Sequence, residues 1–255
     1  MSVERLEITN PRWGGQNADH HNSYLIVVND NRWVAIKNCE RRIDGVKREQ
    51  EIAELRQRLG MPHYYLMARA KFLLRPPQST SNVPDFRDWQ DLPHVLIDFG
   101  SAGRRISLHR IRETKIHIPN QEKTFTQLGE WFAFNTIFGV IDRHLHNFVF
   151  DPDSDQLLSV DNEDLASIAV NPDAGLADYE ERRYAEAAEV LGGRLSADQV
   201  SSCRQNFARA FRERWDKIAL NRGILEQLPV TATIDLARLR IERINRELIL
   251  QQVWV

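Results

Sequence analysis

The first third of the chain alternates between apolar, strand-forming runs and polar turns. Two β-rich runs, SYLIVV (Ser23–Val28) and RWVAIK (Arg32–Lys37), are separated by three turn-forming residues at 29–31. This pattern predicts a β-hairpin. After it, apolar residues near helical spacing predict one helix, which ends at Gly60 and Pro62; these apolar residues are Val46, Ile52, Leu55 and Leu59.

The middle of the chain is irregular before a second β region. Residues 76–94 are rich in Pro, Ser and Asp and predict an exposed loop, and HVLIDFG (His94–Gly100) predicts a short apolar strand. A largely apolar and aromatic stretch from about residue 122 predicts a buried helix. The runs FVF (148–150) and LLSV (157–160) flank the turn sequence DPDSDQ and predict a second hairpin.

The last third is predicted to be helical, with segments near 178–192, 196–221 and 233–252. In the final segment the apolar residues predict a core-packing face, and the arginines among them (238, 240, 243 and 246) predict a solvated face. The apolar set is Ile234, Leu236, Leu239, Ile241, Ile244 and Leu248.

This order of elements predicts an α+β, two-lobed fold. The small strand-rich N-lobe spans residues 1–100 and ends in a hinge strand near 94–102. The larger, mainly helical C-lobe spans 103–255 and holds a candidate catalytic loop at 139–150 and a candidate metal-binding segment at 157–164.

Composition narrows the class of protein. The 255 residues are 42% hydrophobic and 27% charged, with a net charge of −2, which is typical of a globular domain and argues against a dedicated nucleic-acid-binding protein. No apolar run approaches the roughly 18 residues that a membrane span needs. The N-terminus lacks a signal-peptide pattern, and Cys39 and Cys203 are far apart, so we expect a cytoplasmic, reducing compartment and no membrane partner.

The most informative segment is DRHLHN (Asp142–Asn147) followed by Asp161. Asn147 lies five residues after Asp142, and Asp161 lies fourteen after Asn147, with the predicted hairpin between them. Phosphoryl transfer from ATP needs one carboxylate to orient or deprotonate the acceptor, and an amide and a second carboxylate to hold Mg²⁺. The spacing therefore predicts this chemistry. The alternatives are a helix C-cap with a surface turn at 142–144 and a solvated acidic turn at 161–164.

A second set of residues fits the same chemistry. Lys37 ends the VAIK run, and a lysine there, paired with an acidic residue on the next helix, positions ATP phosphates. We prefer Glu49 as the partner because it lies near the apolar face of the helix. Glu51 is the second choice, and Glu54 falls on the opposite, solvated side.

Two weaker signals concern the nucleotide. Gly14 and Gly15 open a polar loop to Asn22, where backbone N–H groups could approach phosphates, although a plain loop fits equally. Asp98-Phe99-Gly100 matches the kinase metal-binding tripeptide, but it precedes Asp142, so we treat it as a coincidence. In the predicted hinge strand near 94–102, the backbone around Ile97 and Phe99 could instead bind adenine.

With these residues in view, the chain resembles the atypical branch of the protein-kinase-like superfamily. GVIDRHLHNFVF (Gly139–Phe150) is similar to the catalytic loop of HipA-type kinases and of phosphatidylinositol 3-/4-kinases, with an Asp-x-His-x-x-Asn pattern. The stretch from Glu49 to Pro62, ending LGMP, is similar to a HipA-like helix and turn. The resemblance covers roughly residues 12 to 165.

The resemblance implies a role for each matching residue. Asp142 would be the catalytic aspartate, Asn147 and Asp161 the Mg²⁺ ligands, and Lys37 the contact to ATP phosphates. His144 would support the loop or, as in lipid-kinase-like sites, serve as the base. HipA-type kinases phosphorylate a protein Ser or Thr, and this implies a protein substrate and an antitoxin-like partner.

The chain also departs from the family pattern. Asp161 is followed by Asn-Glu-Asp and not Phe-Gly, and the chain is shorter than typical HipA proteins. The segment after Asp161 is acidic, whereas lipid kinases carry a basic one, which counts against a phosphoinositide substrate.

The sequence therefore predicts an ATP- and Mg-dependent phosphotransferase, a HipA-like Ser/Thr protein kinase. The alternatives are a small-molecule or lipid kinase of the same fold, a nucleotide-binding pseudokinase that binds partners, and an enzyme that transfers AMP or another group. Ser23, which follows the glycine loop, is a further candidate for self-modification.

Overall fold

The computed structural model describes residues 12–16, 23–28, 32–37, 43–61, 65–68, 94–101, 105–161, 175–221, 223 and 231–253. The chain divides into two compact units, Met1–Arg105 and Ile106–Val255. The first is built on a β-sheet and the second is mainly helical, which confirms the predicted α+β class. The arrangement of two lobes about a hinge stays a prediction.

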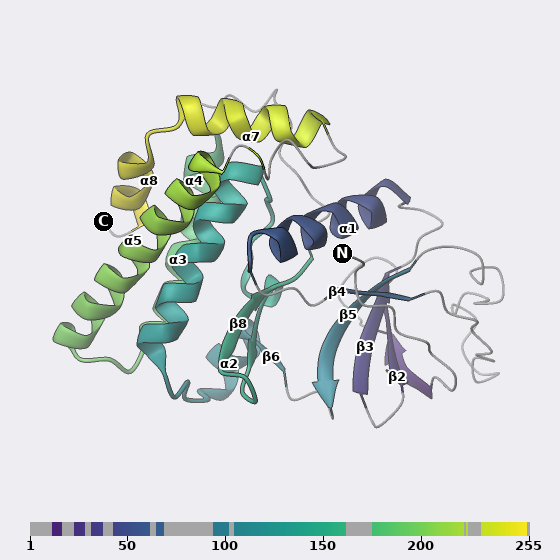
Figure 1. Cartoon of the computed structure of the whole chain (residues 1–255). Coiled ribbons are helices and arrows are strands. Elements are labelled where there is room, and N and C mark those ends of the chain that lie inside the picture. The colour runs from purple at the N-terminus through teal and green to yellow at the C-terminus, as the bar shows by residue number, and fades with distance from the viewer. Residues whose placement is uncertain are drawn as a thin grey trace. The chain divides into compact units, whose positions relative to one another are not determined.

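The first unit is built on a five-stranded antiparallel sheet of order β1-β2-β3-β5-β4 (Figure 1). The predicted hairpin is confirmed: Ser23 lies opposite Lys37, and Val28 lies opposite Arg32. The predicted strand from His94 is also confirmed, and it pairs with β3 on one side and β4 on the other. The strands are β1 (Arg12–Gln16), β2 (Ser23–Val28), β3 (Arg32–Lys37), β4 (Tyr65–Ala68) and β5 (His94–Ser101).

The position of the two glycines differs from the prediction of a loop that opens at Gly14. Gly14 and Gly15 lie inside β1, where Gly15 and Gln16 pair with residues of β2. The register shifts between Trp13 and Gly15. Glycine in a strand often marks a β-bulge, where the register shifts but pairing continues. Strand β1 therefore continues through both glycines while it pairs with β2. Residues 17–22 lie outside the described part of the chain.

Helix α1 (Ile43–Arg58) confirms the predicted helix of the first unit, and it packs against β4 and β5. Ile52 and Leu55 of the helix and Leu59 directly after it are buried, as their spacing predicted. The helix ends where Gly60 takes a left-handed φ of 66°. There the Gly60 N–H donates to the Gln57 carbonyl and the Met61 N–H to the Arg56 carbonyl, which is the Schellman arrangement. The predicted loop 76–94 lies outside the described residues except for His94.

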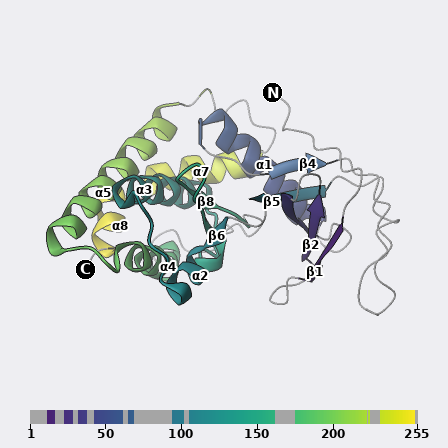
Figure 2. The ribbon, with the colours of Figure 1, turned by 90° about the horizontal axis from the view of Figure 1, so that it is seen from below.

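The second unit combines a group of helices with a small antiparallel sheet of order β6-β7-β8. Helix α3 packs along α5 (Figures 1 and 2), and the ring of Phe132 on α3 meets Phe207 and Phe211 on α5. The elements are β6 (Ile106–Ser107), α2 (Leu108–Thr114), α3 (Gln121–Phe138), β7 (Phe148–Asp151), β8 (Gln156–Ser159), α4 (Gly175–Gly192), α5 (Ala197–Leu220), α7 (Thr231–Arg243) and α8 (Arg246–Val253).

Most of these elements follow the prediction. The buried helix from about residue 122 is α3, and the second hairpin is β7 and β8, with Phe148 opposite Ser159. Strand β6 and helix α2 were not predicted, because elements of two and seven residues carry too little periodicity. Among the described residues, no helix is long and apolar enough to cross a membrane.

The prediction of one helix over 233–252 is wrong. The chain forms two helices, α7 and α8, with a break at Ile244–Asn245. The side-chain oxygen of Asn245 accepts from the Glu247 N–H at 3.0 Å, and asparagine is a preferred residue for starting a new helix.

The burial of side chains in α7 and α8 also differs from the prediction. Leu248 of the predicted core face is 57% exposed. Arg240 of the predicted solvated face is buried, as are four apolar residues outside the predicted core set: Ala237, Ile249, Leu250 and Val253.

Candidate active site

The candidate catalytic loop begins at the end of α3. Gly139 has a left-handed φ of 67°, and the N–H groups of Gly139 and Val140 both donate to the carbonyl of Asn135. The guanidinium of Arg240, on α7, donates to the Ile137 carbonyl at 3.2 Å. The left-handed backbone conformation favours glycine at position 139, and a Cβ there would have to displace that guanidinium.

Asp142, the predicted catalytic aspartate, and Asp161, a predicted metal ligand, both lie in the left-handed region of backbone conformation. The φ of Asp142 is 67° and the φ of Asp161 is 58°. This conformation is uncommon for residues other than glycine and persists only where the surroundings hold it. Such conformations cluster at functional sites, and aspartate and asparagine tolerate them better than most residues.

Arg143 holds the two segments together. Its side chain is fully buried and donates to the carbonyl of Ile141, which belongs to the loop itself. It also donates to the hydroxyl of Ser159 at 2.8 Å, to the carbonyl of Val160 at 3.0 Å and to the carbonyl of Asp161. One guanidinium therefore fixes the backbone that follows β8 against the loop that contains Asp142.

Asn147 closes the loop from the other end. It lies at the end of the short 3-10 helix η3 (Leu145–Asn147) and is buried. Its amide nitrogen donates to the Asp142 carbonyl at 2.7 Å, and its own carbonyl accepts from the Val160 N–H at 2.9 Å. The structure thus brings Asp142, Asn147 and the backbone at Asp161 together, and the arrangement is not the isolated surface turn of the alternative interpretation.

The orientation of Asn147 suits a metal ligand. Because its amide nitrogen is bonded to Asp142, its side-chain oxygen points elsewhere, and no hydrogen bond to that oxygen occurs within the described part of the chain. An amide oxygen and a carboxylate are ligands that Mg²⁺ accepts. The residues described contain no group of three His, Cys, Asp or Glu arranged to hold a metal ion. A metal site at Asn147 and Asp161 stays a prediction, and the donor types fit it.

The hydrogen bond at Nδ1 favours one tautomer of the His144 imidazole. Its Nδ1 accepts from the His146 N–H at 3.2 Å, so the proton of the neutral ring is on Nε2. That nitrogen lies 3.6 Å from the Asp142 carboxylate and 3.4 Å from the Asn147 amide nitrogen. Burial lowers the pKa of His144, and the nearby Asp142 charge opposes this shift. The ring is therefore held neutral and aims its N–H toward Asp142.

Neighbouring elements support the loop. The ring of His146 stacks on His109 of α2, with the ring centroids 4.0 Å apart, and His109 pairs with Glu113 at 3.0 Å. On the other side, the backbone of Leu157 in β8 is held by two side chains of α3: Trp131 donates to its carbonyl and Gln127 accepts from its N–H, each at 2.7 Å. These bonds anchor the hairpin that carries Asp161.

The remaining predicted site residues belong to the first unit. Lys37 is the last residue of β3. Glu49 lies on α1 and is fully buried, which fits its predicted place near the apolar face; Glu51 and Glu54 are both half-buried, so the solvated position predicted for Glu54 is only partly met. Ile97 and Phe99 lie in β5, and Ile97 has strand partners on both sides. The roles of Lys37, Glu49, Ile97 and Phe99 toward a nucleotide stay predictions.

Two arginines of this region were not identified from the sequence. Arg143 lies inside the recognised motif, but spacing does not reveal which carbonyls its side chain reaches. Arg240 was placed on a solvated face because arginines surround it. A glycine at the end of α3 was the available signal that another group approaches closely there.

Comparison with known proteins finds a similar fold but no similar sequence. No protein-family model and no curated protein sequence matches the chain. The structure is similar to the crystal structure of a Helicobacter pylori proinflammatory kinase, CtkA, over 99% of this chain and 98% of that chain, with a TM-score of 0.52 and 10% sequence identity. The open conformation of CtTel1 aligns with 91% of this chain and 11% of its own, at 14% identity, but its TM-score of 0.32 is too low to define a fold.

The likeness to CtkA shows that this chain has a kinase-like fold. This agrees with the resemblance to the protein-kinase-like superfamily. Membership of the HipA-type or phosphatidylinositol 3-/4-kinase branch stays a prediction.

Proposed function

We propose that this protein is an ATP- and Mg²⁺-dependent phosphotransferase that acts on serine or threonine of a protein, in the manner of HipA-type kinases. Two sets of hydrogen bonds carry the proposal. Arg143 donates to the backbone at Val160 and Asp161, and Asn147 donates to the Asp142 carbonyl, so the segments that contain Asp142 and Asp161 are held together. The kinase-like fold supports the reaction class.

In this proposal Asp142 orients the acceptor hydroxyl and takes its proton. The tautomer of His144 favours Asp142 over His144 as the base, because Nδ1 is already an acceptor for the His146 N–H and Nε2 carries the proton. His144 instead aims this N–H at the Asp142 carboxylate and steadies it. The transfer itself relies on positioning and on the stabilisation of charge.

Asn147 and Asp161 would hold Mg²⁺, which neutralises the phosphate charge when it is bound. Arg143 would position Asp161 relative to Asn147, because it donates to the backbone carbonyls of Val160 and Asp161. In the first unit, Lys37 would contact the ATP phosphates and Glu49 would pair with Lys37. Ile97 and Phe99 would supply backbone contacts to adenine, and Gly14 and Gly15 would lie near the phosphates.

Binding is tested first by thermal unfolding with and without MgATP. A ligand that binds only the folded chain stabilises it by about 2.7 kcal/mol at a hundredfold excess over Kd. We expect a Mg²⁺-dependent rise in the midpoint for the wild type that is lost in Asp161→Asn. Asparagine is the sharper choice here, because it tolerates the left-handed backbone while removing the charge.

Asp153→Asn is the matched control, since Asp153 is exposed in the turn between β7 and β8. Its midpoint should rise with MgATP as the wild type does. No shift in the wild type at millimolar nucleotide would contradict the nucleotide site.

Transfer is tested separately with Asp142→Asn. Incubation with MgATP and a mixed protein substrate, followed by mass spectrometry, identifies both the group that moves and the residue that receives it. We expect phosphate on Ser or Thr with the wild type and about 10²-fold less or none with Asp142→Asn. Modification of Ser23 would identify self-phosphorylation.

Two outcomes would favour the alternatives. Nucleotide binding with no transfer to any acceptor would indicate a pseudokinase, and transfer to lipids or small molecules alone would indicate another acceptor class. Undiminished transfer by Asp142→Asn would overturn the role of this residue.

A further inference from the structure

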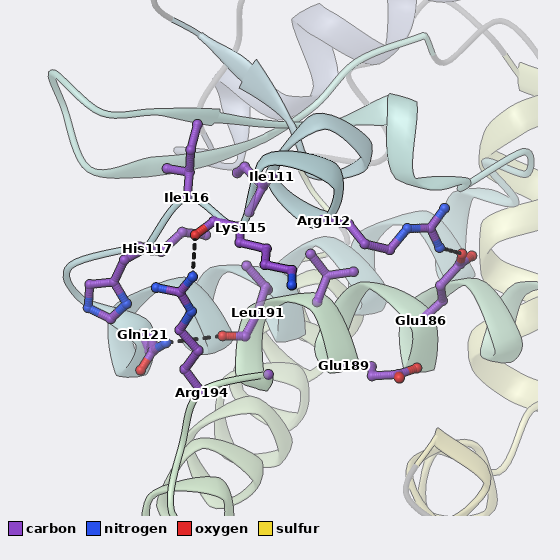
Figure 3. A pocket seen from close by; sticks show the side chains of 13 residues that line it. Ile111, Arg112, Lys115, Ile116, His117, Gln121, Glu186, Glu189, Leu191 and Arg194 are labelled. Carbon is purple, nitrogen blue, oxygen red and sulfur yellow. Dashed lines mark hydrogen bonds and ion pairs between the residues drawn. The ribbon is translucent and has the colours of Figure 1, made fainter.

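The second unit contains a groove that is separate from the candidate active site. It lies between α2, the segment that joins α2 to α3, and the C-terminal half of α4, and it has a volume of about 420 Å³. Its lining comes from residues 111–121 and 186–194, so it includes neither the catalytic loop nor the segment before Asp161. We call it the α2–α4 groove (Figure 3).

The walls of the groove are fixed by hydrogen bonds between its own segments. Arg194 donates to the carbonyl of Lys115 at 2.6 Å, and Gln121 donates to the carbonyl of Leu191 at 3.2 Å. Lys115 ends α2 with a left-handed φ of 54°, a conformation that is costly for lysine and that the bond from Arg194 helps to hold. The groove is therefore formed before any ligand arrives.

The floor is apolar and the rim is charged. Ile111, Ile118 and Leu191 are buried beneath the groove. At the rim, Arg112 is already neutralised by Glu186 at 2.8 Å. Figure 3 shows Arg194 beside His117, Glu189 farther along the groove, and the Lys115 side chain between them near Leu191.

This distribution of charge favours a ligand with a negatively charged group. Lys115 is exposed and makes no ion pair within the described part of the chain, and Arg194, also exposed, uses one nitrogen on a backbone carbonyl. These two cations, with His117 beside them, outweigh Glu189. A ligand with a carboxylate at the cationic side and an apolar group on the floor would match both features.

The exposure of the rim indicates the kind of molecule. Small-molecule sites enclose most of their ligand, whereas seven of the thirteen lining residues here are exposed to solvent. Such a groove suits a segment that presents one or two side chains while the rest of the molecule stays outside.

We propose that the α2–α4 groove binds an extended peptide segment of a partner protein in which an apolar side chain lies beside an acidic one. The apolar side chain packs on Ile111, Ile118 and Leu191, and the acidic one pairs with Lys115 and Arg194. This binding does not depend on phosphoryl transfer.

The test uses a phage-displayed library of random heptapeptides selected on the full chain. We expect the recovered peptides to share Asp or Glu next to Leu, Ile, Val or Phe. Recovery of no enriched peptide, or of peptides without an acidic residue, would overturn the proposal.

The best recovered peptide, labelled with fluorescein, is then titrated with three variants by fluorescence polarisation. Lys115→Glu should weaken binding about three- to tenfold, because attraction is replaced by repulsion. Glu189→Lys should bind the same peptide more tightly, because a cation replaces an anion at the rim, and misfolding would not produce this gain. Lys217→Glu, at an exposed lysine near the end of α5, is the matched control and should leave Kd unchanged.

Thermal melts of all three variants establish that they fold. If folded Lys115→Glu binds the peptide as tightly as Lys217→Glu does, the peptide lies elsewhere and the proposal is wrong.

Discussion

Arg143 has no exposed surface, and its side chain donates to the backbone carbonyls of Ile141, Val160 and Asp161 and to the hydroxyl of Ser159. A buried guanidinium with such partners acts as a brace between two chain segments. If it is removed, several buried acceptors lose their donor, and each unsatisfied group costs about 1–3 kcal/mol.

We therefore expect Arg143→Ala to lower the free energy of unfolding by about 3 kcal/mol or more. Arg143→Lys should recover only part of this loss, because a single ammonium cannot span acceptors that a planar fork reaches together. Urea unfolding measures both changes. Arg182→Ala, at an exposed position on α4, is the control and should change stability by less than about 0.5 kcal/mol. A small effect of Arg143→Ala would mean that the brace is not needed.

The buried environment of His144 gives a second residue-scale prediction, for the chain without metal. Burial lowers the pKa of His144 below the ordinary value of 6.5. The unfolded chain therefore takes up this proton first as the pH falls, and the folded state loses stability from pH 6.5 down to the lowered pKa. Above pH 6.5 the ring is neutral in both states and contributes no pH dependence.

His144→Gln removes this proton uptake. Between pH 7 and pH 5 in EDTA, the variant should lose less stability than the wild type, as measured by urea unfolding at each pH. A steeper loss in the variant would indicate that the pKa of His144 is raised and not lowered.

At the scale of elements, the second unit depends on how closely α3 and α5 approach. At Gly129 of α3, an added Cβ would collide with the backbone carbonyl of Phe207 on α5, and a backbone atom cannot move aside as a side-chain end can. The aromatic rings of Phe132, Phe207 and Phe211 fill the space beside this contact. The helix that leads to the catalytic loop is thus fixed by a glycine two turns before its end.

Gly129→Ala should destabilise the chain by about 1–3 kcal/mol, because overpacking exceeds the gain of about 1 kcal/mol from the better helix propensity of alanine. Differential scanning calorimetry gives the change in Tm. Gly193→Ala is the comparison, since a Cβ there meets the Glu189 carbonyl at an ordinary 3.4 Å, and its Tm should stay near that of the wild type. Equal Tm values for the two variants would show that α3 and α5 can move apart without a loss of stability.

At the scale of the whole molecule, the division at Arg105 gives the second unit its own aromatic core and its own small sheet. A unit with a separate core can fold by itself. The candidate catalytic loop and the α2–α4 groove both lie within Ile106–Val255.

Residues 106–255 expressed alone should therefore fold. We expect a helical far-ultraviolet circular dichroism spectrum and a single cooperative unfolding transition. The same fragment should not respond to MgATP as the full chain does, because Lys37 is missing. A fragment without cooperative unfolding would mean that the core of the second unit is incomplete without the first.

The sequence predicted the features that local patterns encode. Both hairpins and α1 follow from alternation, helical spacing and turn residues, and the residues at 142, 147 and 161 follow from spacing around a hairpin. It could not predict features set by distant neighbours. The register shift between Trp13 and Gly15 depends on β2, and the burial of Arg240 depends on a carbonyl of α3. The break at Asn245 instead involves a local side-chain cap, which the continuous helical pattern over 233–252 did not reveal. The groove escaped prediction because its two walls are about seventy residues apart in the chain.

The contact of Arg240 with the end of α3 also affects how the protein is made. The carbonyl of Ile137 receives this hydrogen bond from a residue 103 positions later. During translation at about 5–20 residues per second, the nascent chain carries the finished sequence of the catalytic loop for roughly 5–20 seconds before Arg240 is added. A ribosome-bound chain that already contains Asp142, Asn147 and Asp161 thus lacks the last support of its loop, and the completed α7 supplies it.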